Sequence, residues 1–388
     1  DNAARNWAGT TSGAVNLVRS GQNTLTIVSA NAHTGTTLIN GNTTVLQSEG
    51  AFTGTSALDV NYATLNLDND GGIGGSNNRI ADAAAVTFRG AGMTFTGRRQ
   101  SASTEAFGAV SIDQGYNALT ATTGGTGLNS VDLTFSSLSR PAGSAATFNI
   151  SGTNLGTIGS NSRVTVGTLN GTSVSATVFS ANGNGLTNNL VGPWAIVGNE
   201  FATYVPGLGI AALNQTGAAQ YDQTNTFAGG TAVENIRLTS NTTIPSGGSN
   251  VNSVTMTGAN IALSFAVATD VLNLTSGGLI GPNNNKSIGA EVDSGRITAG
   301  GATPAANTDL YLYNRSNTLT VNSRLIDNAN GSGSSLRVVL TASGGSINLV
   351  NTAASYTGGT VVNGGTVNLL ASASGVTVPL AATPANGL

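Results

Sequence analysis

The stretch Ala354–Leu369, with the sequence ASYTGGTVVNGGTVNL, constrains the fold of this chain more than any other feature. It opens with an aromatic residue, Tyr356, and continues with two short runs of Thr and Val, residue types that favour the pleated surface of a β-sheet. A glycine pair precedes each run, first Gly358, Gly359 and then Gly364, Gly365, and glycine permits the abrupt change of direction that a corner requires. The pattern predicts a strand, a tight corner and a second strand.

The same pattern recurs at two other places in the chain. Phe227 precedes a glycine pair and a Thr-Ala-Val run, as Tyr356 does, and His33 takes the aromatic position in a copy near the N-terminus. One strand with corners every few residues cannot bury its own apolar face, whereas a stack of such units can. The repeat therefore predicts an all-β fold, a single elongated parallel β-solenoid.

Aligning the three copies predicts which residues are structurally equivalent. One set fills an aromatic slot in the corner, and the other is a strand position whose side chain should point inward. The first set is His33, Phe227 and Tyr356, and the second is Leu38, Ala232 and Val361.

The chain divides into three segments by the regularity of its apolar pieces. Residues 1–52 hold the first repeat coils, with a spacing that indicates one coil per twenty-odd residues. Residues 53–213 form an irregular β-solenoid segment with loops, and residues 214–388 a second repeat series of the same solenoid. The best helical candidate is Ile80–Phe88, although a strand explains its second half better.

Composition excludes several classes of function. Only 8% of the residues are charged and the net charge is −3, so no basic stripe exists for binding nucleic acid. The chain has no cysteine and no apolar run long enough for a membrane-spanning helix. The few charges and the abundant hydroxyl side chains favour an exported protein.

The repeat resembles the autotransporter-associated β-strand repeat family, which occurs in passenger regions of large exported bacterial proteins. Tyr356–Thr366 carries the aromatic residue, both glycine turns and the valine pair, and Phe227–Val233 matches the first half. The resemblance implies a right-handed parallel β-helix at the cell surface of a bacterium, without catalytic residues. We therefore expect a structural segment of an extracellular surface fibre or filament. The alternative is an adhesin-type passenger that binds glycans or host-cell surfaces.

Three groups of residues deserve comparison with known sites. His33 is the only histidine, so any His-based metal site or triad would need it, but filling the aromatic slot explains it more simply. Asp68-Asn69-Asp70-Gly71 resembles the start of a calcium loop, yet lacks the third ligand and the distal Glu. Glu291 and Asp293, with Arg296 nearby, form the best carboxylate cluster, which is more typical of a solvated charged face. We predict no enzyme activity, no cofactor and no metal site.

Two further features of the sequence resemble binding sites. Trp194, Phe201 and Tyr204 form the densest aromatic patch, either a sugar-stacking platform or a loop packed onto the coil. The pair Gly124–Gly125 lacks the helix and lysine of a phosphate-binding loop.

We also expect self-association end to end into filaments. Neither end of the sequence has the pattern of a terminal cap, and uncapped strand edges tend to pair. The alternative is that the segment belongs to a longer covalent solenoid, in which further coils would cover the same edges.

Overall fold

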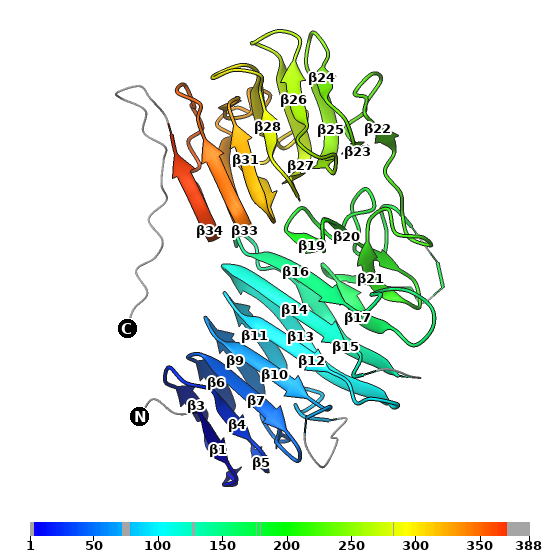
Figure 1. The fold of residues 1–388 in the computed structure, drawn as a ribbon, viewed down its shortest axis with the longest axis vertical. Helices are drawn as coiled ribbons and strands as arrows, with labels where there is room; N and C mark the ends of the chain where they lie inside the picture. Colours follow the sequence, from blue (N-terminus) through cyan, green and yellow to red (C-terminus); the bar gives the residue numbers. More distant parts are fainter. Residues whose placement is uncertain are drawn as a thin grey trace. The chain divides into compact units, whose positions relative to one another are not determined.

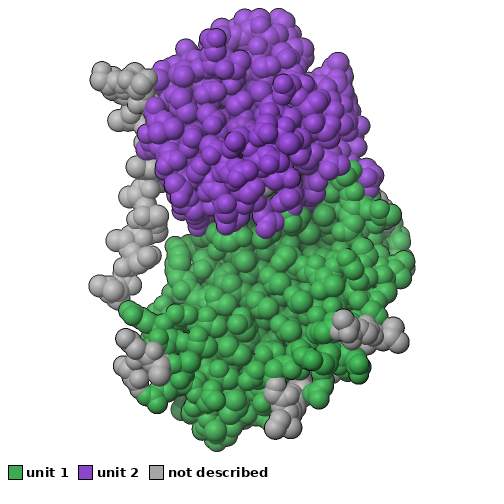
Figure 2. Space-filling view, in the orientation of Figure 1, with its two compact units in different colours: residues 1–191, 195–198, 202–219 green, residues 192–194, 199–201, 220–388 purple. Residues whose placement is uncertain are grey.

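The computed structural model describes residues 4–71, 78–125, 129–175, 177–178, 180–281 and 283–370. These residues form 34 β-strands, and none of them lies in an α-helix (Figure 1). They divide into two compact units (Figure 2). Unit 1 comprises residues 1–191, 195–198 and 202–219, and unit 2 comprises residues 192–194, 199–201 and 220–388.

Three sheets build unit 1, and the chain visits them in turn, so that each strand pairs with strands one coil before and one coil after it. The first sheet has the order β1 (Arg5–Trp7), β4 (Leu25–Ile27), β7 (Thr43–Gln47), β10 (Thr64–Asp68), β12 (Gly92–Thr96), β14 (Tyr116–Thr122), β16 (Thr147–Gly152), β19 (Ala195–Val197), β20 (Glu200–Val205), β21 (Gly209–Ala212). The second has the order β18 (Thr172–Ser173), β17 (Ser162–Leu169), β15 (Ser130–Ser139), β13 (Ala102–Gln114), β11 (Ala85–Arg89), β9 (Ala57–Asn61), β6 (Thr36–Asn40), β3 (Leu17–Ser20). The third contains β2 (Ser12–Gly13), β5 (Ala30–His33) and β8 (Ala51–Phe52).

The stacked strands of unit 1 run parallel and in register. Leu67 of β10 lies opposite Leu46 of β7 and Phe95 of β12, and all three side chains are fully buried. Burial alternates along these strands, because successive side chains of a strand point to opposite faces. The interior is therefore a continuous apolar ladder, and the outer face carries the polar residues.

Coil length increases along unit 1. Arg5 pairs with Leu25, so an early coil holds 20 residues (25 − 5 = 20). Tyr116 pairs with Thr147, so a later coil holds 31 (147 − 116 = 31). Parallel stacking gives way to antiparallel pairing at β17–β18 and at β20–β21.

Unit 2 contains one 13-stranded sheet, in which ten strands form a continuous path and three more pair beside it (Figure 1). The path has the order β22 (Gln223–Thr224), β23 (Asn235–Leu238), β25 (Ser249–Met256), β27 (Val271–Gly281), β30 (Asn307–Asn314), β33 (Ser335–Leu349), β31 (Asn317–Val321), β28 (Lys286–Ile288), β26 (Ala262–Phe265), β24 (Thr242–Ile244). The other three are β29 (Arg296–Ala299), β32 (Arg324–Leu325) and β34 (Thr360–Leu369).

An apolar ladder also forms the core of unit 2. Val254, Leu279, Leu312 and Leu340 lie opposite one another in successive coils, and each is fully buried. The next member, Val362 of β34, is 41% exposed. Within the described residues β34 pairs only with β33, so one edge of β34 carries no described strand.

The predicted all-β class with stacked parallel strands is confirmed. The segment 80–88 contains the strand β11 in its second half, as expected, and no helix. Residues 1–52 and most of 53–213 share the sheets of unit 1. No helix in the described part of the chain is long and apolar enough to cross a membrane.

Candidate functional site

The repeat corners contain the most regular side-chain geometry in the molecule. His33 is fully buried at the end of β5, where its Nε2 lies 2.8 Å from Thr37 Oγ1 and its Nδ1 lies 3.3 Å from Thr11 Oγ1. Its ring meets Phe52 edge-on at 5.9 Å. Burial lowers the pKa of His33, so the imidazole is neutral and both ring nitrogens have hydroxyl partners. This packing matches a filler of the aromatic slot and leaves no nitrogen free for a metal.

The corner at Tyr356 repeats this arrangement. The Tyr356 hydroxyl lies 2.6 Å from Thr360 Oγ1. Thr360 follows Tyr356 by four residues, just as Thr37, the partner of the His33 ring, follows His33 by four. Tyr356 is buried, and burial raises the pKa of its phenol. Phe227 is buried as well, although its ring has no polar atom to reach Thr231.

The strand positions after the corner correct one prediction. Leu38 and Val361 are equivalent, but neither points inward: Thr37 and Thr360 are buried, and the next side chain in each strand therefore faces out. The hydrogen bond to the ring residue fixes the threonine inside, and this decides the orientation of the strand. Ala232 lies in a turn rather than a strand, so the Phe227 copy does not match the other two here.

The glycines of the corner act by close approach to the preceding coil. A Cβ on Gly358 would lie 2.5 Å from the carbonyl oxygen of Leu336, and one on Gly35 would meet the carbonyl oxygen of Val15. Gly359 and Gly365 adopt positive φ angles of 82°. The predicted second turn at Gly364–Gly365 is instead a register shift within the continuous strand β34.

Ionic ladders on the outer faces join each coil to the next. Arg89 of β11 pairs with Asp59 of β9 and with Asp113 of β13, the latter at 2.7 Å. Arg163 pairs with Asp132 at 2.5 Å in the same manner. In unit 2, Arg337 donates two hydrogen bonds, of 2.7 and 2.9 Å, to Asp309 of the preceding coil. These hydrogen bonds raise the pKa of Arg337.

Sequence reasoning missed these ladders, although a signal was present. The acid and the arginine are separated by 30, 31 and 28 residues, which is one coil in each region. Hydroxyl pairs show the same spacing, as between Thr134 and Thr165 at 3.1 Å.

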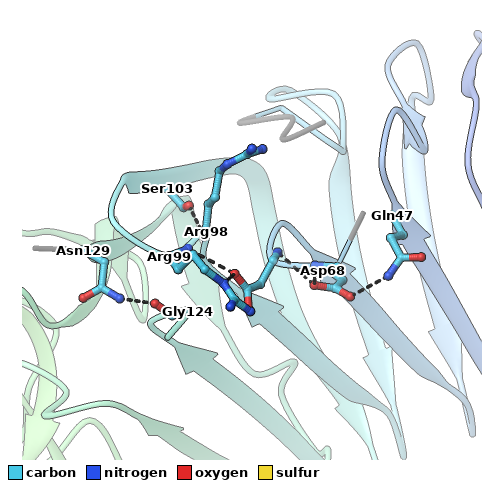
Figure 3. Close-up of polar contacts among 9 residues, drawn as sticks. Gln47, Asp68, Arg98, Arg99, Ser103, Gly124 and Asn129 are labelled. Carbon is cyan, nitrogen blue, oxygen red and sulfur yellow. Dashed lines mark hydrogen bonds and ion pairs between the residues drawn. The ribbon is translucent and has the colours of Figure 1, made fainter. Parts of the chain in front are cut away.

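The segment that resembles a calcium loop is tied to protein donors. Asp68 Oδ1 accepts the N–H groups of Asp70 and Gly71 at 3.0 and 2.8 Å, and Asp68 Oδ2 accepts Gln47 Nε2 at 3.0 Å (Figure 3). The carboxylate of Asp70 pairs with Arg99 at 2.6 Å, and this hydrogen bond lowers the pKa of Asp70. These carboxylates hold a corner and its neighbouring coil together.

A fully buried arginine stabilises the same corner from inside. Arg79 donates to the side chain of Asn69 at 2.6 Å and to the carbonyl oxygen of Asp68 at 2.9 Å. The buried carboxylate of Glu105 accepts the backbone N–H groups of Arg79 and Ile80, both at 2.9 Å. Burial raises the pKa of Glu105 to about 7 despite these hydrogen bonds.

The carboxylate cluster predicted around Asp293 does not form a facing pair. Asp293 Oδ1 accepts the N–H groups of Thr352 and Ala353 at 2.9 and 3.1 Å, and these bonds belong to a loop contact between coils. Glu291 is exposed, and its backbone bonds to Ser294. The described residues contain no group of three or more His, Asp or Glu side chains that could hold a metal ion.

The aromatic patch does not offer ring faces to a ligand. Trp194 is 5% exposed, Phe201 is 0% exposed and Tyr204 is 4% exposed. Trp194 and Phe201 belong to unit 2, where the Phe201 ring packs on Gly278, whereas Tyr204 belongs to unit 1 and accepts the N–H of Val166 at 3.5 Å. These positions match the packing interpretation. The corner at Gly124 likewise packs on the carbonyl oxygen of Gly97.

One polar cluster next to this patch was not anticipated. The Tyr221 hydroxyl donates to Glu200, and the Arg237 guanidinium lies 5.9 Å from the centre of the Tyr221 ring. Burial raises the pKa of Glu200 and, together with Glu200 itself, that of Tyr221. Arg237 Nη2 lies 3.4 Å from Glu200, so the three side chains form a closed network that stabilises unit 2.

The side chains of these corners and ladders thus bind other coils of the same chain. Comparison with protein-family models, with curated proteins and with solved structures finds no match for this chain.

Proposed function

We propose that this chain is a structural segment of an extracellular surface fibre or filament of a bacterium. In this proposal the stacked coils form a right-handed β-solenoid of the autotransporter-associated repeat type. The observation that carries the proposal is the use of polar side chains. The aspartates, arginines and threonines of the outer strand faces bond to the next coil, as in the ladders around Arg89, Arg163 and Arg337. Such ladders reinforce the backbone pairing between the coils that they join.

The composition supports an exported location. Hydroxyl contacts between coils, such as that of Thr134 with Thr165, do not depend on ionic strength, and a chain without cysteine does not depend on the redox state of its compartment. The test is immunolabelling of intact and of lysed cells of the source bacterium. We expect labelling of intact cells, and labelling that appears only after lysis would contradict the proposal.

We further propose that end-to-end contacts between coils build the filament. The edge of β34 that carries no described strand, with Val362 and Leu369 exposed beside it, supports a stacking contact. Electron microscopy of the isolated chain over a range of concentrations tests this. Filaments that lengthen with concentration are expected, whereas single short particles at every concentration would refute end-to-end assembly and favour a segment of a longer covalent solenoid.

The rings of Trp194, Phe201 and Tyr204 are buried, which favours packing over sugar stacking for this patch. The residues that support glycan binding line a different part of unit 2, a groove described below.

A further inference from the structure

A groove in unit 2 is lined by two arginines that lie on neighbouring strands. Its volume is about 500 Å³, and Arg296 at the start of β29 and Arg324 of β32 both line it. The two residues are register partners on neighbouring parallel strands. Their guanidinium groups therefore project from strands separated by about 4.8 Å, the usual spacing of a sheet.

This pair departs from the rule that the other ladders follow. Like charges directly opposite each other on neighbouring strands destabilise a sheet. Arg89, Arg163 and Arg337 each lie opposite or beside an aspartate of the next coil. Arg296 instead faces Arg324, and its side chain has no hydrogen bond or ion pair with any described residue.

Among the described residues only one neighbouring carboxylate, that of Asp293, forms an ion pair with either arginine, and this pair with Arg324 is long. Asp293 lies 3.8 Å from Arg324 Nε, but its oxygens accept three hydrogen bonds from Thr352 and Ala353. Asp327, which also lines the groove, accepts the N–H groups of Leu336 and Thr357 and the hydroxyl of Thr357. The guanidinium donors that face the groove are thus available to an anionic group from outside.

A second cavity adjoins the first and is polar without charge. It has a volume of about 300 Å³ and shares Ile326, Asn328 and Ala329 with the arginine groove. Amide side chains line it, including those of Asn250 and Asn273. Thr298 also lines it, only 2% exposed, and the Thr298 hydroxyl has no hydrogen-bond partner among the described residues.

A buried hydroxyl without a partner has a cost of about 1–3 kcal/mol, which a ligand with hydroxyl groups would remove. Amides supply both donors and acceptors and so suit the hydroxyls of a sugar ring. Two guanidinium groups one strand apart suit a carboxylate or a similar oxyanion. The two cavities together match one ligand that carries both kinds of group.

We propose that these cavities form a single groove that binds an acidic oligosaccharide. A carboxylate of a hexuronate residue lies between Arg296 and Arg324, and the hydroxyls of the adjacent sugar ring bond to Thr298 and to the amide of Asn250, since the amide of Asn273 already bonds to Gly301. This binding role goes beyond the structural role proposed above and does not depend on it.

The test is isothermal titration of the full chain with three trisaccharides of equal linkage. One is a hexuronate, one is the neutral hexose analogue, and one is a sulfated analogue. We expect the hexuronate to bind at least tenfold more tightly than the neutral analogue, since a charge-assisted hydrogen bond contributes about 1.5–3 kcal/mol. Added salt should weaken the hexuronate complex and leave any complex with the neutral analogue unchanged. Equal binding of the acidic and neutral sugars, no binding of the hexuronate, or binding of the sulfated analogue only would each overturn the proposal.

Three variants locate the site. Arg296→Gln should weaken hexuronate binding about tenfold or more without lowering the unfolding temperature, because Arg296 has no partner to lose. Arg98→Gln is the matched control: Arg98 is exposed in unit 1 and extends away from the neighbouring polar contacts in Figure 3. Thr298→Val removes the hydroxyl and keeps the shape, so binding of the sugar should fall while the unfolding temperature stays equal or rises. Equal affinities for Arg296→Gln and Arg98→Gln would place any bound sugar elsewhere.

Discussion

His33 and Glu105 are buried titratable residues, and burial moves their pKa values in opposite directions. For His33 the charged form is the protonated one, so burial lowers the pKa. For Glu105 the charged form is the deprotonated one, so burial raises the pKa to about 7. The two residues therefore give unit 1 opposing dependences of stability on pH.

Replacing His33 with Phe should remove one of these dependences. The folded-state pKa of His33 lies below the unfolded value of 6.5, so the unfolded chain binds the proton first and stability falls as pH drops below about 6.5. Phe cannot be protonated, and Phe227 already occupies the equivalent position in another copy of the repeat. Urea unfolding at pH 8 and pH 5 should show that the variant loses less stability at low pH than the wild type. An equal loss in both proteins would contradict the assignment.

Replacing Glu105 with Gln should produce the opposite change. The folded-state pKa of about 7 exceeds the ordinary value of 4.5 for a glutamate, so the wild type loses stability as pH rises from about 4.5 through 7. The difference corresponds to roughly 3 kcal/mol at 1.36 kcal/mol per pKa unit. Gln stays neutral, but its amide offers one acceptor to two N–H groups, so the variant should be less stable than the wild type at pH 5. Unfolding free energies at pH 5 and pH 8 measure both effects, and an unchanged slope would refute them.

The sequence predicted the role of His33 but not that of Glu105. His33 occupies the aromatic position of a recognisable repeat, and the repeat fixes its environment. Glu105 binds two backbone N–H groups across a coil of irregular length, and no local pattern marks such a long-range contact.

At the level of elements, the ladder between β30 and β33 should contribute measurable stability. The Asp309–Arg337 pair is bidentate and partly buried, with 17% and 24% of the two side chains exposed. A double-mutant cycle with Asp309→Asn and Arg337→Gln should give a coupling energy of about 0.5–1 kcal/mol, because partial exposure screens the charges. High salt should reduce the coupling. A coupling near zero at low salt would mean that backbone pairing alone joins these coils.

The corner glycines permit a comparison between the three copies. Gly35→Ala and Gly358→Ala place a Cβ against the carbonyl group of the preceding coil, whereas Gly229→Ala meets no atom and adds only the strain of a φ of 73°. We expect a cost of about 1–3 kcal/mol for the first two and about 1 kcal/mol for the third. Thermal unfolding of the three variants checks the order, and a largest loss in Gly229→Ala would refute the role of the close approach.

Alternation of apolar residues was enough to predict strands such as β10, β12 and β15, because one face of each is buried. It was not enough to predict the inward residue after each corner. Val and Leu there resemble core residues, but the hydrogen bond from His33 or Tyr356 places a threonine inside and turns Leu38 and Val361 outward.

At the scale of the whole molecule, stacked coils should yield to force one at a time. A coil of 31 residues, such as that from Tyr116 to Thr147, would extend by about 100 Å when released, at 3.3–3.6 Å per residue. Single-molecule pulling from the two ends should therefore give a series of steps whose sizes follow the coil lengths, from 20 residues at Arg5–Leu25 to 47 residues at Phe148–Ala195 (195 − 148 = 47). One event that releases a whole unit at once would show that the coils do not unfold independently.

The division into two units was not predicted. The repeat copies on either side of it are alike in sequence, which favoured one continuous solenoid. The antiparallel pair β20–β21 interrupts parallel stacking in the segment 200–212, and its turn, with Gly207 at a φ of 76°, has no counterpart in the repeat. The aromatic residues of this segment indicated sugar stacking or loop packing, and not a break between units.

The ladders between coils also restrict how such a chain can change in length over generations. Removing one residue from a coil would turn every later side chain of that strand to the other face and separate each aspartate from its arginine. Removing or duplicating an entire coil would keep both the faces and the partners, since each ladder connects equivalent positions of adjacent turns. Inheritance of this architecture therefore favours gains and losses of whole turns, and related chains should differ by lengths close to one coil rather than by scattered single residues.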